Sequence, residues 1–350
     1  MTPARTPGMA THEIELTEPV DLCVADGSSL NPAARGWSRR PLHRANLRGC
    51  FGVNKRWDYW AVLAGDLVVS AVYSNIDHFG LADVYWVDLA TGETGGKGIL
   101  TPAEAIDLPE LPGTTPLLVD RDGLDLRMVD GEAGTRLTAS WSEPDGRPGQ
   151  LDVLVELPVA HESLNVVIPW SETVFNFTSK HQARPAVGHL AVGDRTWPIG
   201  GPDGAESWGV LDVGRGRWPH EVAWNWGGGA GRVGDHVVGL QIGAKWTEGS
   251  GFTENGLIVD GRLTKLGSEL HWDYSWDEPM RPWHIVEPGG QLDMVLAPRF
   301  DKHSRADAGE LGSETHQVFG RWSGRLRTDD GLELDFSGLQ GFAEEARQRW

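Results

Sequence analysis

The sequence predicts an all-β protein made of two antiparallel β-barrel halves packed together, with little helix. Short runs that alternate apolar and polar residues begin near residue 50, as in Trp57–Asp77 (WDYWAVLAGDLVVSAVYSNID), and such alternation is typical of strands with one buried face. The runs recur roughly every ten residues, a spacing typical of sandwiches and up-and-down barrels. Asp-Gly pairs at 122–123, 130–131 and 145–146 supply the positive-φ residues that two-residue hairpins need.

The same rhythm of strands and turns continues to the end of the chain. We expect a lead-in segment at 1–35, a first barrel-like half at 36–190 and a second at 191–350. Helix-forming patterns occur in TPAEAIDL and in the closing FAEEARQRW, so we predict a short C-terminal helix. Because strands do not alternate with long helices, a parallel α/β fold is disfavoured.

Composition excludes several classes of partner. The net charge of −19 disfavours contact with phosphate backbones, so no nucleic-acid partner is expected. No apolar run reaches the length of a membrane span, and the first residues lack the apolar stretch of a secretory signal. Cys23 and Cys50 are too few for a disulfide framework, which favours a cytoplasmic location. Nothing in the sequence indicates an oligomeric state.

The chain contains seventeen tryptophans against four tyrosines. An indole combines a large apolar area with one N–H donor, which suits both a packed core and the wall of a ligand cavity. In a strand, Trp224 and Trp226 would share one face while Asn225 points to the other.

These residues belong to the densest segment, Asp212–Gly227 (DVGRGRWPHEVAWNWG), which we predict to border the main ligand cavity. The alternative is structural: Asp212 and Arg215 form an ion pair in a glycine-rich turn, and the tryptophans fill the core.

Two further polar clusters adjoin apolar runs. Lys180 and His181 follow VVIPWSETVFNF, and Glu254 and Asn255 precede LIVDG. Both clusters are also typical of ordinary loops. The pair His181-Gln182 is echoed at His316-Gln317, which is a faint sign of internal duplication.

Three familiar motifs occur without the neighbouring elements or spacing that their function requires. Gly229–Gly234 matches the dinucleotide fingerprint, but a strand follows it instead of a helix, so a hairpin loop is predicted. Ser207 in AESWG resembles a nucleophile elbow without the strand and helix that the elbow needs. Short His/Asp couples such as Asp301–His303 lack a recognised ligand spacing, so no metal is predicted.

The run VVIPW…FNFTSKHQ…VGHL, then DVGRGRWPHEVAWNWGGG, TENGLIVDGRLTKL, HQVFGRWSGRL and GLQGFAEEARQRW, resembles the bacterial domain-of-unknown-function family numbered 2804. The resemblance runs from about residue 35 to the C-terminus. More distantly, the chain is similar to the tandem lipocalin-like group of carotenoid 1,2-hydratases, tocopherol cyclases and some fungal Diels–Alderases. That similarity implies two lipocalin-like (calycin-like) barrels, a ligand site in or between them, and chemistry without an organic cofactor. It assigns no catalytic residue to this chain.

Three functions remain open. The first is a cofactor-independent enzyme that hydrates, isomerises or cyclises an apolar, isoprenoid- or polyketide-like substrate. Such chemistry needs a carboxylic acid whose pKa is raised by an apolar pocket, and aromatic faces that stabilise positive charge. The second is a carrier that binds a hydrophobic small molecule without chemistry. The third is a hydrolase or lyase whose metal is held by scattered histidines and carboxylates.

The candidate residues come from the three segments above and from the His316 echo. The candidate catalytic residues are Asp212, His220, Glu254 and His181. The candidate ligand-binding residues are Arg215, Trp218, Trp224, Asn225, Trp226, Lys180, Asn255 and His316.

Overall fold

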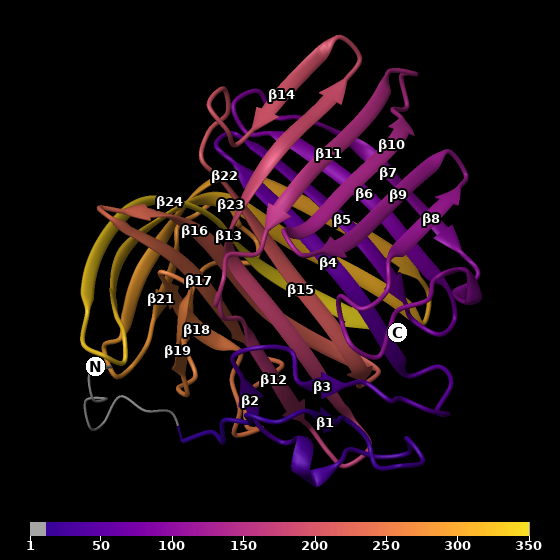
Figure 1. Ribbon diagram of the computed structural model, residues 1–350, viewed down its shortest axis with the longest axis vertical. Coiled ribbons are helices and arrows are strands. Elements are labelled where there is room, and N and C mark those ends of the chain that lie inside the picture. The colour runs from indigo at the N-terminus through magenta and orange to yellow at the C-terminus, as the bar shows by residue number, and fades with distance from the viewer. Residues whose placement is uncertain (1–11, 350) are drawn as a thin grey trace.

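The protein is formed by two large curled sheets of antiparallel strands, seen as separate layers in the computed structural model (Figure 1). The structure describes residues 12–349, so residues 1–11 of the expected lead-in segment lie outside the described residues. The predicted all-β architecture of two antiparallel half-barrels with little helix is therefore confirmed. In the described part of the chain, no helix has the length and apolar character needed to span a membrane.

The first sheet has thirteen strands. Its main path runs β7-β6-β5-β4-β15-β13-β11-β10-β9-β8; off this path, β12 and β14 pair with β13, and β2 pairs with β12. The strands are β2 (Trp37–Ser38), β4 (Asn54–Ala64), β5 (Leu67–Asn75), β6 (Gly80–Asp88), β7 (Glu93–Thr101), β8 (Leu117–Arg121), β9 (Leu124–Gly131), β10 (Gly134–Ser142), β11 (Pro148–Glu156), β12 (Leu164–Pro169), β13 (Phe175–Val192), β14 (Arg195–Ile199) and β15 (Ser207–Arg217).

The second sheet has nine strands in the order β19-β18-β17-β16-β24-β23-β22-β21-β20. Its strands are β16 (Glu221–Val233), β17 (His236–Ala244), β18 (Asn255–Val259), β19 (Arg262–Leu266), β20 (His271–Asp273), β21 (Trp283–Val286), β22 (Leu292–Ala308), β23 (Leu311–Arg327) and β24 (Glu333–Arg349). The remaining elements are the parallel pair β1 (Val20–Asp21) and β3 (His43–Arg44) and the 3-10 turns η1 (Pro32–Ala34) and η2 (Ala103–Ala105).

Each sheet curls around its own apolar core, and a third apolar layer lies between the sheets. In the first sheet, the curl brings β6 and β10 together: Trp86 and Trp141 donate their indole N–H groups to the same oxygen of Glu143, at 2.8 and 2.9 Å. Between the sheets, Trp226 and Phe342 of the second sheet pack with Val210 of the first. Side chains that point out of one curled sheet are thus buried against the other.

The hairpin predictions are partly confirmed. Asp122 and Gly123 both have positive φ and connect β8 to β9, as a two-residue hairpin requires. Asp145-Gly146 lies in the loop between β10 and β11. Asp130-Gly131 instead belongs to the end of β9, and the turn falls on the next two residues.

The predicted C-terminal helix is wrong. Residues 342–349 form part of β24, which pairs with β16 on one side and β23 on the other; Trp350 lies outside the described residues. Alanine, glutamate and arginine favour helices only weakly, by tenths of a kcal/mol per residue, and two complete hydrogen-bonded ladders outweigh that preference. At the other predicted helix, only the three-residue turn η2 forms.

The chain passes from the first sheet to the second between Arg217 and Glu221. The strands β14 and β15 therefore lie in the first half, whereas the expected boundary followed residue 190. β15 is paired on both sides, with β4 and β13, which fixes it inside the first sheet.

Candidate functional site

Two rows of polar side chains meet between the sheets. Tyr59, Asp212 and Lys180 are direct cross-strand neighbours on β4, β15 and β13. Glu344 and Gln317 are direct neighbours on β24 and β23 of the second sheet. The rows touch where the Gln317 Nε2 donates to the Tyr59 hydroxyl at 3.3 Å.

Lys180 is the cation at the centre of this buried cluster. Its Nζ lies 2.8 Å from Asp212 Oδ1 and 3.2 Å from Glu254 Oε2, and 4.5 Å above the ring of Trp226. Burial alone lowers the pKa of Lys180, but the two carboxylates outweigh it and raise that pKa above its ordinary value. Lys180 is therefore charged at neutral pH.

Glu254, which directly precedes β18 of the second sheet, also contacts Lys180. Its Oε1 accepts the indole N–H of Trp246 at 2.5 Å, whereas its Oε2 accepts no hydrogen bond from any described residue. Burial raises the pKa of Glu254 to about 7, and the nearby Asp212 adds to this while Lys180 opposes it. At neutral pH this carboxyl is thus shared between its acid and base forms, and its Oε2 is paired with the Lys180 ammonium.

Glu344 is the second buried acid of the cluster. Its Oε1 accepts the indole N–H of Trp224 at 2.8 Å, and its Oε2 accepts Gln317 Nε2 at 2.9 Å. Burial raises the pKa of Glu344 to about 7 as well. Both of its oxygens are occupied, so its orientation is fixed.

A layer of indoles covers the carboxyls on one side. Trp57 donates to Asp212 Oδ2 at 3.1 Å. Trp218 packs edge-on against Trp57 and Trp224, with ring centroids 5.4 and 5.7 Å apart, and stacks on Trp246 at 5.5 Å. Trp57 and Trp224 are half-buried, so this layer extends from the buried acids to the surface. Chemically, the arrangement combines a proton donor or acceptor with aromatic faces that favour positive charge.

The structure brings half of the predicted site residues into this one cluster. They are Lys180, Asp212, Trp218, Trp224, Trp226 and Glu254. As predicted, the indoles of Trp224 and Trp226 share one face of β16, and Asn225 points to the other, where its Nδ2 donates to the Tyr274 hydroxyl at 3.0 Å.

The structural ion pair between Asp212 and Arg215 is wrong. Residues three apart in a strand point to opposite faces, and both lie in β15. Arg215 instead forms a buried pair with Asp58, Nη2 to Oδ1 2.6 Å, on the side of the first sheet away from Lys180. Asp212 pairs with Lys180.

The other predicted residues lie elsewhere. His220 is exposed in the turn between β15 and β16. His181 Nε2 lies 3.0 Å from Ser179 Oγ, and burial lowers the pKa of His181 well below its usual range. Asn255 is buried, accepts the Gly243 N–H at 2.7 Å and donates to the Ser268 carbonyl.

His316 lies on the second sheet, where its Nδ1 is 2.8 Å from Asp301 Oδ2. It points to the concave face of that sheet, together with Val318 of the apolar core, whereas Gln317 points to the buried cluster. His316 is therefore separate from the acids between the sheets.

Sequence reasoning missed Glu344, Gln317, Tyr59, Trp57 and Trp246. The signal for Glu344 was present: in a strand it shares a face with Phe342 and Ala346, both fully buried. Interpreting the segment as a helix concealed that alternation.

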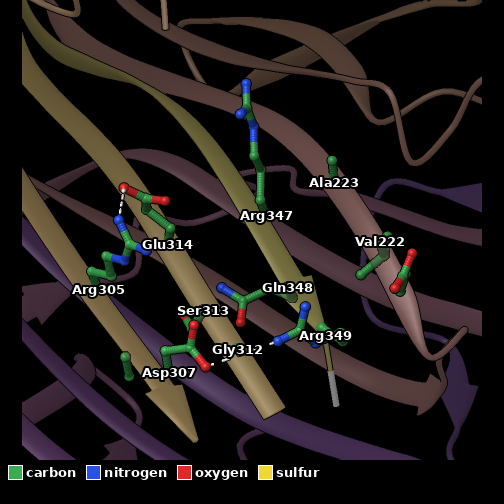
Figure 2. Close-up of a pocket in the computed structure, with 12 residues that line it drawn as sticks. Val222, Ala223, Arg305, Asp307, Gly312, Ser313, Glu314, Arg347, Gln348 and Arg349 are labelled. Atoms are coloured by element: carbon green, nitrogen blue, oxygen red, sulfur yellow. Dashed lines mark ion pairs between the residues drawn. The ribbon is translucent and has the colours of Figure 1, made fainter. Parts of the chain in front are cut away.

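Two hollows lie away from the cluster. The larger, about 530 Å³, is open to solvent over the ends of β16, β22, β23 and β24, where charged side chains such as Arg305, Glu314 and Arg349 line it (Figure 2). Within the segment predicted to border the main cavity, Glu221, Val222 and Ala223 line this hollow. Arg215 lines the other, of about 380 Å³.

The sequence matches, over residues 13–350, the family described as a domain of unknown function (DUF2804), and the chain belongs to this family. Among curated proteins, none matches the chain. Its fold is similar to that of kievitone hydratase from Nectria haematococca, at 12% sequence identity over 85% of this chain and 89% of that one, with a TM-score of 0.48. It is also similar to CghA, at 10% identity over 95% and 97% of the two chains, with a TM-score of 0.44. A second structure, CghA with Sch210972, has a TM-score of 0.42 at 10% identity over 85% and 89% of the two chains.

Proposed function

We propose that this protein is a cofactor-independent enzyme that transfers protons to and from an apolar, isoprenoid- or polyketide-like small molecule, and so hydrates, isomerises or cyclises it. The observation that carries the proposal is a pair of fully buried carboxyls, Glu254 and Glu344, whose pKa values burial raises to about 7. A general acid or base works best when its pKa lies near the operating pH.

Glu254 is the proton-transferring group in this proposal. Its Oε2 is paired with the Lys180 ammonium and accepts no further hydrogen bond from any described residue, whereas both oxygens of Glu344 accept hydrogen bonds from neutral side chains. Lys180 supplies a fixed positive charge 3.2 Å from Oε2, which stabilises the carboxylate after the proton has left. Glu344 and Asp212 hold the surrounding indole and lysine side chains in position.

The indole layer defines the class of substrate. Carbocation-like intermediates form when a carbon–carbon double bond is protonated, and the faces of Trp218 and Trp224 in this layer provide the electron density that favours such charge. A layer that is apolar apart from its N–H groups favours a substrate of the same character. In this proposal the substrate approaches Glu254 past Trp57 and Trp224, because these are the half-buried members of the layer.

The test is turnover in D₂O. The full chain would be incubated with a panel of unsaturated isoprenoids and polyketide-derived enones, and the products examined by mass spectrometry for added water or carbon-bound deuterium. The proposal predicts that Glu254→Gln abolishes any such product, while Glu143→Gln leaves it unchanged. Glu143 is a matched control because it is also buried and accepts two indole N–H groups, but it lies at the curl of the first sheet.

Two results would contradict the proposal. Equal turnover by wild-type protein and Glu254→Gln would exclude Glu254 as the acid. Tight binding of a panel member that gains neither water nor carbon-bound deuterium would instead indicate a carrier.

A further inference from the structure

The concave face of the second sheet holds a compact group of metal-ligating side chains. His303 on β22 and His316 on β23 are direct cross-strand partners, and their rings stack with centroids 4.1 Å apart and an angle of 2° between the planes. Glu314 lies two residues before His316 on the same face, and its Oε1 is 3.1 Å from His303 Nε2. One ligand atom from each of the three lies within 4.8 Å of the others, and no other group of this kind occurs in the described part of the chain.

The group also has the outer partners that orient metal ligands. Asp301 Oδ2 lies 2.8 Å from His316 Nδ1, which places the ring proton on Nδ1 and leaves Nε2 as a lone-pair donor. Trp276 packs edge-on against His316 at 4.6 Å, and Arg347 lies over the Trp276 ring at 3.6 Å. The ring of His316 is therefore held in one orientation before any ligand binds.

We propose that His303, Glu314 and His316 form an exchangeable binding site for a divalent transition metal of the zinc class. Two imidazoles and one carboxylate make a donor set that suits zinc and its neighbours better than magnesium or calcium. Three protein ligands leave at least one coordination position for water or an anion. Glu314 also lines the open hollow of about 530 Å³, which gives solvent and small anions access to that position (Figure 2).

This site is separate from the proposed proton-transfer site. The three ligands point to the concave face of β22 and β23, whereas Gln317 points through the opposite face to Glu344. The backbone ladder between β22 and β23 sets the positions of both histidines, so the proposal predicts that removal of the ion leaves the fold intact.

A simple histidine–carboxylate pair is the alternative, and the same sheet supplies a matched control. His284 Nε2 lies 2.8 Å from Asp293 Oδ1, and no third ligand group joins them among the described residues. A pair of this kind binds a divalent ion far more weakly than three convergent ligands.

The test is a Zn²⁺ titration of the full chain, freed of metal with a chelator, in competition with a chromogenic zinc indicator. We expect one Zn²⁺ per chain. His303→Ala, His316→Ala and Glu314→Gln should each weaken binding by more than the roughly 10- to 100-fold that loss of an outer partner costs, and Asp301→Asn should cause a loss within that range. His284→Ala should bind as the wild type does.

Co²⁺ supplies a second readout, because its visible absorption reports the coordinating atoms directly. His303 is 44% exposed on its side chain, so His303→Ala should keep the wild-type midpoint of unfolding without metal, which excludes misfolding as the cause of lost binding. The proposal is overturned if the wild type binds less than one Zn²⁺ per chain, or if His303→Ala and His284→Ala bind alike.

Discussion

The Glu254 carboxylate lies 3.2 Å from Lys180 Nζ, although Lys180 belongs to the first sheet and Glu254 directly precedes β18 of the second. Because Lys180 also contacts Asp212 on its own sheet, a single buried cation serves two carboxylates across the interface. This buried ionic cluster of Lys180, Asp212 and Glu254 therefore also links the two half-barrels.

Replacing Lys180 with methionine should destabilise the protein by about 3–5 kcal/mol, because it leaves two buried carboxylates without their shared cation. Protonation of Glu254, whose pKa burial already raises to about 7, can offset part of this loss, so the loss should be larger at pH 8 than at pH 5. Urea unfolding at both pH values measures it. The control is Arg136→Met, which breaks an exposed pair with Asp152 and should cost less than about 1 kcal/mol.

The titration of Glu254 and Glu344 should make the folded state less stable as pH rises. Their pKa values are about 7 in the folded protein against an ordinary value of 4.5, so the unfolded chain releases these protons first. Stability from this source is complete below pH 4.5 and is lost as pH rises through 7, at roughly 1.4 kcal/mol per pKa unit for each group.

Buried histidines act in the opposite sense, so the measurement must be a difference. Burial lowers the pKa of His43 to about 4, which makes stability rise with pH between about 4 and the ordinary histidine value of 6.5. The free energy of unfolding should be compared between pH 4 and pH 7 for the wild type and the Glu254→Gln, Glu344→Gln double variant. A flatter decline in the double variant is expected, and parallel curves would refute the assignment.

Replacing Arg215 should lower the folding stability without changing the titration of the buried carboxyl of Glu254. Its pair with Asp58 is buried, so Arg215→Met should cost about 3–5 kcal/mol in chemical denaturation. Because the side chain points away from Lys180, the titration of Glu254 should stay unchanged in this variant. A shifted Glu254 titration at near-native stability would show that Arg215 belongs to the site after all.

The interface between the sheets should be sensitive to Phe342. This side chain is fully buried, and its ring packs on Trp226 with centroids 4.6 Å apart. Phe342→Ala should cost about 3–5 kcal/mol of folding stability. Phe51→Ala removes an equal side chain at a position that is 75% exposed, and should change stability by no more than about 0.5 kcal/mol. Similar effects of the two variants would contradict the buried interface.

The fold could be predicted because alternation and hairpin residues are local signals. The positive φ of Asp122 and Gly123, for example, follows directly from their residue types. The site was harder to predict, because it depends on which face of each strand meets the other sheet. Trp224 and Trp226 could be placed on one face from spacing alone, but nothing local shows that Glu344 faces them.

Ion pairing was the least predictable feature. Asp212 and Arg215 are close in sequence, yet each finds its partner on a neighbouring strand, at Lys180 and Asp58. Strand register, which a single sequence does not contain, decides such pairs. The C-terminal strand was mispredicted for a related reason. Its composition favours a helix weakly, and pairing with the two neighbouring strands determines its conformation.

The central claim is that Glu254 is a buried acid that titrates near neutral pH, and pH-dependent infrared difference spectroscopy tests it most directly. The wild-type protein should show protonated carboxyl absorption from Glu254 and Glu344 that disappears with a midpoint near pH 7. Glu254→Gln should remove the Glu254 part of this absorption and the Glu254→Gln, Glu344→Gln double variant all of it, whereas the Glu143→Gln control should keep both parts. The account is contradicted if the band that Glu254→Gln removes titrates in the ordinary range of an exposed glutamate, near 4.3 on average.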